Sequence, residues 1–157
     1  MTAFHHYPSP IGTLLLVGEG GRLRELHFAN SPDNQMMAGA SLHQDLSLAQ
    51  VASQLDEYFR GERTSFDLDL DLRGTDFQQR VWRELQNIPY GGTASYSDIA
   101  QRIGNPKACR AVGMANRRNP IPIIIPCHRV IGRDGSLTGF GGGLDVKERL
   151  LALERKA

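Results

Sequence analysis

Cysteine is scarce in this sequence. Only Cys109 and Cys127 occur among 157 residues, and no CxxC pair is present. This excludes a disulfide-stapled scaffold and a cysteine-rich zinc site. The four N-terminal histidines make a weak case for a metal ion, so we expect no metal and no cofactor. They are His5, His6, His27 and His43.

Long hydrophobic runs are also missing. No stretch approaches the roughly 20 consecutive apolar residues of a membrane-spanning helix. The N-terminal sequence MTAFHHYPSP lacks the basic region, apolar core and cleavage site of a signal peptide. We therefore expect a cytoplasmic protein with reduced thiols and no membrane partner.

The net charge of +1 conceals an uneven distribution. Residues 1–72 carry 4 Lys and Arg against 10 Asp and Glu, whereas residues 73–157 carry 14 against 7. No acidic residue stands between Asp98 and Asp134, a stretch that contains many arginines. Such a field is typical of a protein that binds a polyanion, although a solvated basic face explains the charges about as well.

Residues 1–72 are predicted to form a small α/β domain without evident chemistry of its own. Apolar runs and turn signals predict a hairpin of strands over 13–18 and 22–28, followed by a loop over 30–39.

A helix and a strand are expected to complete this domain. The helix is predicted to begin after an N-cap at Ser47 and to end at Gly61. The strand is predicted from the alternation of Phe66, Leu68 and Leu70 with aspartates.

Residues 73–157 are predicted to form a mainly helical domain. Thr75 is expected to cap its first helix, in which Trp82 belongs to the buried stripe. Two short helices follow around a Gly-Asn-Pro turn, the first capped by Ser97 and the second starting near Pro106.

The second of these short helices has one narrow apolar face and one basic face. Two short helices with a glycine turn are typical of a helix-turn-helix, and an ordinary helical hairpin is the alternative. The small residues favour the first interpretation, because they allow the backbone to approach a partner. The apolar face is formed by Ala108, Ala111, Val112 and Ala115, and the basic face by Lys107, Arg110, Met114 and Arg117.

The segment after this helix, NPIPIIIPCHRVIG, brings Cys127 beside His128 and Arg129. Its prolines exclude a regular central strand, and its isoleucines are expected to be buried. Nearby positive charge would favour a reactive thiolate, but neighbouring residues of an extended chain point to opposite sides. Contact between Cys127 and His128 would therefore need a tight turn or a bridging water. These residues alone leave Cys127 undecided between nucleophile and small buried residue.

The same segment carries a family resemblance. IPCHRV, with NPIPIII before it and GSLTGFGGGLDVKERLLALE after it, resembles the active-site region of O6-alkylguanine-DNA alkyltransferases, the methylated-DNA–protein-cysteine methyltransferases. The resemblance continues upstream through FQQRVW, IPYGGTASYSDIA and GNPKACRAVGMANRRNP, so it covers residues 75–154. SPIG and YFRGE also resemble the more variable N-terminal domain of that family.

The resemblance implies a fold and an activity. The fold would be α/β, with an RNase H-like N-terminal domain over 1–72 and a C-terminal domain over 73–157 that contains a winged helix-turn-helix. The activity would be DNA repair by irreversible, single-turnover transfer of an alkyl group from O6-alkylguanine, and also from O4-alkylthymine, to the protein. The partner would be double-stranded DNA, bound by a monomer that is able to act cooperatively along it.

The resemblance also assigns catalytic roles to five residues. Cys127 would accept the alkyl group, and His128 would act as general base through a bound water. Glu154 would orient His128, Tyr96 would assist nucleotide rotation and donate a proton toward guanine N3, and Asn119 would hold the turn near the site.

Further residues would bind DNA or the damaged base. Arg110 would enter the duplex in place of the flipped nucleotide. The other DNA-binding candidates are Lys107, Ala111, Ala115 and Arg117, and the pocket candidates are Met114, Pro126, Phe140 and Gly141.

The chain departs from the family pattern at Phe140, where a tyrosine is usual. A phenylalanine ring stacks but donates no hydrogen bond, so Tyr96 and backbone N–H groups would have to replace that hydroxyl. The family's zinc site uses N-terminal cysteines, which are missing here. Two other functions remain as alternatives: a non-catalytic binder of alkylated DNA, against which Cys127 argues, and a cysteine hydrolase, for which no oxyanion hole is evident.

Overall fold

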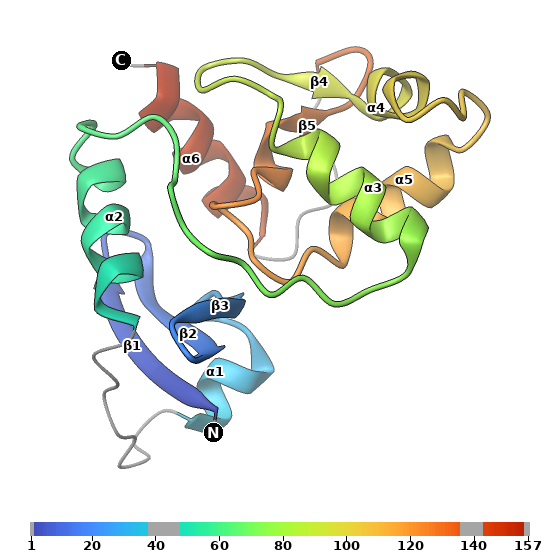
Figure 1. Cartoon of the computed structure of the whole chain (residues 1–157). Helices are drawn as coiled ribbons and strands as arrows, with labels where there is room; N and C mark the ends of the chain where they lie inside the picture. Colours follow the sequence, from blue (N-terminus) through green and yellow to red (C-terminus); the bar gives the residue numbers. More distant parts are fainter. Residues whose placement is uncertain (1, 38–47, 136–142, 156–157) are drawn as a thin grey trace. The chain divides into compact units, whose positions relative to one another are not determined.

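The computed structural model describes residues 2–37, 48–135 and 143–155 (Figure 1). The chain divides into two compact units, Met1–Leu72 and Arg73–Ala157. The first contains a small sheet and the second is mainly helical, which confirms the α/β fold class. None of the described helices is long and apolar enough to cross a membrane.

The first unit is built on a three-stranded antiparallel sheet in the order β1-β2-β3. The predicted hairpin is confirmed as β2 (Gly12–Glu19) and β3 (Arg22–His27). Strand β1 (Ala3–Ser9) was not predicted, because its sequence AFHHYPS lacks a clear alternation of apolar and polar residues. It lies at the edge of the sheet, where Pro8 is tolerated.

The loop predicted over 30–39 is wrong in part, because Pro32–Met37 form helix α1. Tertiary contacts stabilise this helix. Ser31 Oγ accepts a hydrogen bond from the backbone N–H of Asn34, and the buried Asn34 side chain donates to the carbonyls of Thr13 and Phe28. These contacts select a single helical turn that no sequence periodicity indicates.

Helix α2 (Ala49–Phe59) matches the predicted helix and buries Val51, Leu55 and Tyr58. Its N-cap is Leu48, while the expected cap Ser47 lies outside the described residues. The helix ends before Gly61, which has a φ of 75°.

The strand predicted over residues 66–72 is wrong: this segment forms only an isolated bridge between Leu70 and Leu23. The alternating exposure is nevertheless as predicted up to Leu70, with Asp67 and Asp69 exposed. The backbone of Asp67 bonds to the Gln54 side chain, which donates to its carbonyl and accepts from its N–H. The Gln54 side chain thus makes the backbone hydrogen bonds that a neighbouring strand would otherwise make.

The second unit contains four helices and two short parallel strands in its described part. Helices α3, α4 and α5 pack against one another, and α6 packs against the turn that carries Cys127 (Figure 1). The elements are α3 (Asp76–Leu85), β4 (Ala94–Ser95), α4 (Tyr96–Arg102), α5 (Cys109–Arg117), β5 (Val130–Ile131) and α6 (Leu144–Arg155).

Local capping explains where these helices begin. Thr75 caps α3 as predicted, through a capping box with Gln78. The predicted cap of α4 is wrong by two residues, because Ser95 and Asp98 form the capping box. The Ser97 hydroxyl instead accepts from Arg133.

Helix α5 starts at Cys109 rather than near Pro106, which lies in a turn. The Ala108 N–H donates to the Asn105 carbonyl in that turn. Trp82 is a core residue, as predicted: it is 2% exposed, and its indole N–H donates to the Ala115 carbonyl at 2.8 Å. This bond fixes α5 on α3.

Candidate active site

Cys127 is the first residue of a 3₁₀ turn, Cys127–Arg129, that follows the proline-rich segment. Ile121, Ile123, Ile124 and Ile125 before it are buried and do not form a regular strand, as predicted. Asn119 organises this segment: its side chain donates to the Ile125 carbonyl at 2.7 Å and accepts from the Ile121 N–H at 2.9 Å. The thiol is therefore held on a rigid support, with Cys127 only 4% exposed.

Burial governs the electrostatic state of Cys127. It raises the pKa of the thiol to about 11, although a hydrogen bond from Asn119 and the charge of Lys147 act in the opposite direction. The thiol is thus protonated at neutral pH. The sequence left open whether nearby positive charge favours a thiolate, and the Arg129 guanidinium instead donates to Glu154 and to the Ile88 carbonyl.

His128 is fully buried and has one ring nitrogen bonded to Glu154. Its Nε2 lies 2.6 Å from Glu154 Oε2, while its Nδ1 is buried without a hydrogen-bond partner among the described residues. Burial lowers the pKa of His128, and Glu154 opposes that shift. A carboxylate accepts but does not donate, so the neutral ring carries its proton on Nε2 and leaves the Nδ1 lone pair available as a base.

Arg129 holds Glu154 in place. Its Nε and Nη2 donate to the two carboxylate oxygens at 2.8 and 3.1 Å, and its Nη1 donates to the Ile88 carbonyl at 2.7 Å. The guanidinium also lies 5.8 Å from the centre of the Tyr90 ring. This forked contact is short and charge-assisted, and it fixes the carboxylate that orients the imidazole. No pattern in the sequence predicts that Arg129 faces inward.

Lys147 was also missed. It is 0% exposed, and its Nζ donates to the Val130 carbonyl at 2.5 Å. A signal was present, because Lys147, Leu150, Leu151 and Glu154 have the i, i+3, i+4, i+7 spacing of a buried helical stripe, and all four are buried in α6.

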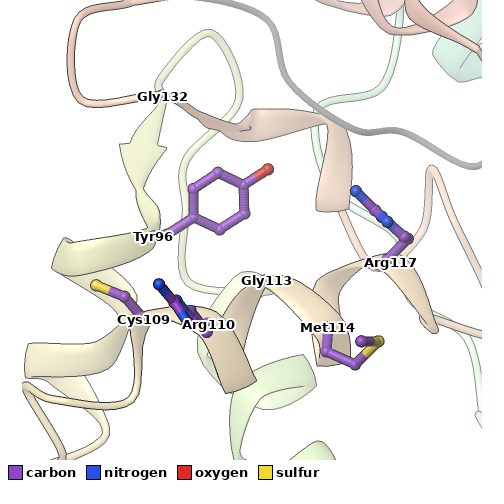
Figure 2. Close-up of a pocket in the computed structure, with 7 residues that line it drawn as sticks. All are labelled: Tyr96, Cys109, Arg110, Gly113, Met114, Arg117 and Gly132. Atoms are coloured by element: carbon purple, nitrogen blue, oxygen red, sulfur yellow. The ribbon is translucent and has the colours of Figure 1, made fainter.

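A separate surface of this unit forms a pocket of about 460 Å³. Figure 2 shows the Tyr96 side chain above α5, with Arg110, Met114 and Arg117 projecting from that helix. The ring lies against Gly113, where a Cβ atom would come within 3.7 Å of it. The full lining is Tyr96, Cys109, Arg110, Gly113, Met114, Arg117 and Gly132.

The DNA-binding candidates on and just before α5 differ in their solvent exposure. Lys107, Arg110, Ala111 and Arg117 are exposed, and Met114 is 52% exposed. Ala115 is different: its side chain is only 2% exposed and faces the core, so it cannot itself contact DNA. Its small size allows α5 to pack closely on α3.

Not all of the residues predicted to form the base pocket line the pocket beside α5. Met114 lines the pocket, but Pro126 and Cys127 are buried and are not among its lining residues in the described part of the unit. Phe140 and Gly141 lie outside the described residues.

Among the residues that the structure describes, one group of potential metal ligands is found, in the first unit. The ligand atoms of Glu25, His27 and Asp33 lie within 4.8 Å of one another. His27 Nε2 already lies 2.9 Å from Glu25 Oε1, so a hydrogen bond accounts for this contact.

Family models match nearly the whole chain. Residues 76–156 match the DNA-binding domain of 6-O-methylguanine DNA methyltransferase, and residues 3–72 match the ribonuclease-like domain of the same family. The chain belongs to the 6-O-methylguanine DNA methyltransferase family. The resemblance carried by the IPCHRV segment is thereby confirmed.

Individual relatives agree with this family. A methylated-DNA–protein-cysteine methyltransferase of Mycolicibacterium paratuberculosis is 51% identical over 156 residues, covering 99% of this chain and 94% of the relative. One of Methanosarcina acetivorans is 49% identical over 148 residues, covering 94% of this chain and 95% of the relative.

Solved structures of this family share the fold. The crystal structure of Mycobacterium tuberculosis O6-methylguanine methyltransferase has a TM-score of 0.88 at 49% identity, covering 99% of this chain and 94% of that one. A crystal structure of Mycobacterium tuberculosis OGT in complex with DNA has a TM-score of 0.88 at 50% identity, covering 98% and 93%.

Proposed function

We propose that this protein repairs double-stranded DNA by transferring the alkyl group of O6-alkylguanine to its own Cys127. Its family and named relatives support the activity class, a methylated-DNA–protein-cysteine methyltransferase. The observation that carries the proposal is the buried His128, bonded to Glu154 through Nε2 and free at Nδ1, directly beside a buried thiol.

The reaction begins with removal of a proton from a neutral thiol. His128 Nδ1 accepts the Cys127 proton through a bound water, and Glu154 stabilises the imidazolium that forms. Arg129 keeps the carboxylate in position for this task. A bridging water explains how adjacent residues cooperate without direct contact, and the 3₁₀ turn brings them closer than an extended chain would.

The sulfur then attacks the O6-alkyl carbon. The new S–C bond forms as the C–O6 bond breaks, and guanine leaves with the electron pair. Tyr96 donates a proton toward guanine N3 as the base departs, and Asn119 holds the segment that carries the sulfur. The thioether is stable, so each molecule reacts once, and attack on a saturated carbon requires no metal or cofactor.

Access to the alkyl carbon requires extrusion of the nucleotide, which costs a few kcal/mol. The exposed face of α5 and the turn before it offset this cost: Arg110 replaces the flipped nucleotide, while Lys107 in the turn and Arg117 contact phosphates. Ala111 allows close approach, and Tyr96 and Met114, which line the pocket beside α5, contact the extruded nucleotide. Phe140 and Gly141 are further candidates for contact with the base, by the family resemblance alone. O4-alkylthymine is a second substrate, and the monomer binds cooperatively along DNA.

The direct test is transfer of label from duplex DNA containing O6-[methyl-³H]guanine. We expect label on Cys127 in the wild type and in Cys109→Ser, and none in Cys127→Ser. Intact protein with a free Cys127 thiol that acquires no label would overturn the proposal. Lesion binding without transfer would indicate the non-catalytic binder.

The finger role of Arg110 has its own test. We expect Arg110→Ala to slow transfer from duplex DNA on the order of 100-fold, because a few kcal/mol of extrusion cost is no longer offset. Transfer from the free base O6-methylguanine should change little. Arg83→Ala, at an exposed position of α3, is the control. Equal losses on duplex and free base would contradict the role.

A further inference from the structure

We propose that Asn116 determines base specificity in the proposed alkyl transfer, because its side-chain oxygen accepts a hydrogen bond from the 2-amino group of the extruded guanine. The inference rests on the proposed function, since it needs an alkylated guanine at Cys127. It assigns a task to a buried amide that the mechanism above does not use.

Asn116 lies on the buried side of α5, beside the segment that carries Cys127. It is only 3% exposed, and its Nδ2 donates to the Cys127 carbonyl at 3.4 Å. The residue before it, Ala115, accepts the hydrogen bond from Trp82 that fixes this part of α5 on α3. The amide is therefore held against the backbone of the residue that carries the proposed acceptor sulfur.

Only one end of this amide has a hydrogen-bond partner. A carbonyl accepts and does not donate, so Nδ2 faces Cys127, and Oδ1 is buried without a partner among the described residues. Gln54, which is also buried, uses both ends of its amide on the backbone of Asp67. An unpaired buried acceptor costs free energy, and most buried polar groups in proteins are paired. Such an acceptor is suited to a donor that a ligand brings.

The location of the unpaired oxygen points to the substrate. In the described part of the second unit, two buried side-chain atoms lack a hydrogen-bond partner, Asn116 Oδ1 and His128 Nδ1. Both flank Cys127, because His128 follows it directly and Asn116 bonds to its carbonyl. The mechanism above uses His128 Nδ1 for the thiol proton, so Asn116 Oδ1 is the acceptor that this site still offers.

The chemistry of the alkylated base identifies the donor. Alkylation at O6 removes the proton from guanine N1, so the 2-amino group is the donor that remains on this edge of the base. N1 lies between the ring carbons that carry O6 and the amino group, so both groups share one edge. A base that presents its O6-alkyl carbon to the Cys127 sulfur thus presents the amine to the groups around Cys127. A base without the amine leaves Oδ1 unpaired and is disfavoured.

A lesion without the amino group tests this contact. Duplexes contain either O6-methylguanine or O6-methylhypoxanthine at the same position, and single-turnover transfer to Cys127 is measured over a range of duplex concentrations. The wild type is compared with Asn116→Ala and with Asn116→Leu, which is similar in size but has no polar side-chain atom. Asn87→Ala, at an exposed position in the turn after α3, is the control. Thermal unfolding is recorded for each protein.

We expect the wild type and Asn87→Ala to react about tenfold faster with the guanine lesion than with the hypoxanthine lesion at subsaturating duplex. In both Asn116 variants this preference should fall to about threefold or less, because the guanine lesion reacts more slowly. Transfer from O4-methylthymine, which has no amino group, should change little. The different extrusion costs of the two purines affect all proteins alike and cancel in the comparison.

Two results would refute the contact. One is a guanine preference that is missing in the wild type or unchanged in both Asn116 variants. The other is an equal loss on the two purine lesions, which would mean that Asn116 supports the Cys127 segment or holds a water instead of the amine.

A binding measurement separates this inference from the proposed function. The Kd of Cys127→Ser for the same two duplexes is measured with and without Asn116→Leu. The amine should strengthen binding about tenfold only when Asn116 is present, and an equal contribution in both backgrounds would contradict the inference. If this selectivity holds but the wild type transfers no methyl group, the proposed function is wrong and the amine contact stands.

Discussion

At the scale of single residues, the site is built from buried polar groups whose desolvation is offset by hydrogen bonds to one another. His128, Arg129, Lys147 and Glu154 are all buried polar groups, and the Glu154 carboxylate is shared by the first two. Such an arrangement is stable only when its members satisfy one another. The unpaired His128 Nδ1 is the exception, and it is the atom that the proposed mechanism uses as the base.

The Glu154 carboxylate offers a sharp test of this arrangement. Glu154→Gln is expected to slow alkyl transfer on the order of 100-fold, because the neutral amide no longer stabilises the imidazolium. It should also lower the free energy of unfolding by several kcal/mol, since Arg129 loses its buried partner. Glu148→Gln, at an exposed position of the same helix, should change neither quantity. Single-turnover kinetics and urea unfolding check both outcomes.

The raised pKa of Cys127 predicts a loss of stability at high pH. Its value rises from 9.0 to about 11 on folding. The native state therefore retains a proton that the unfolded state loses, and this stabilisation is complete below pH 9 and disappears as the pH rises through 11. The difference in unfolding free energy between the wild type and Cys127→Ser should fall by about 3 kcal/mol across that window. A difference independent of pH would show that the thiol is not held protonated by burial.

At the scale of elements, helix starts depend on short-range hydrogen bonds. The Thr75 hydroxyl accepts from the Gln78 N–H at 3.1 Å, and the Gln78 side chain accepts from the Thr75 N–H at 3.0 Å. The same arrangement of Ser95 and Asp98 starts α4. Each capping box spans four residues, so a sequence pattern indicates it. The prediction of Ser97 as the cap of α4 was therefore wrong by only two positions.

The contribution of the α3 cap is measurable. Thr75→Ala should lower the free energy of unfolding by about 1 kcal/mol, because the Gln78 N–H loses its acceptor. Thr75→Ser retains the hydroxyl and should be close to the wild type. The free energies of unfolding are compared by chemical denaturation, with the same m-value for the wild type and both variants. A loss of equal size in both variants would mean that the methyl group, not the cap, stabilises the helix.

At the scale of the whole molecule, charge is segregated between the two units. The first has an excess of acidic residues, while the exposed face of α5 in the second carries Arg110 and Arg117. Each phosphate contact releases counterions, so DNA binding by such a face weakens steeply with salt.

Salt dependence therefore identifies the residues that contact phosphate. Arg117→Ala should weaken duplex binding for all sequences and reduce the slope of log K against log salt by about 0.9. Arg60→Ala, at an exposed position of the first unit, should leave the slope unchanged. An unchanged slope in Arg117→Ala would remove this residue from the DNA interface.

Features that depend on neighbours along the chain are predictable from the amino-acid sequence alone. These include the amphipathic helices, the capped start of α3, the β2–β3 hairpin and the irregular, buried segment before Cys127. Periodicity, proline geometry and turn residues act over a few positions, so their signals are local. Through the family resemblance, the sequence also predicts the fold class and the activity class.

The state of the site around Cys127 depends on tertiary packing. A pKa depends on every group packed around it, so burial raises the pKa of Cys127, a question that the arginine-rich sequence alone left open. The inward orientation of Arg129 and Lys147, and their partners on distant elements, follow from packing in the same way. Tertiary contacts also explain helix α1 and the irregular segment around Asp67, because the buried Asn34 and Gln54 side chains supply their hydrogen bonds.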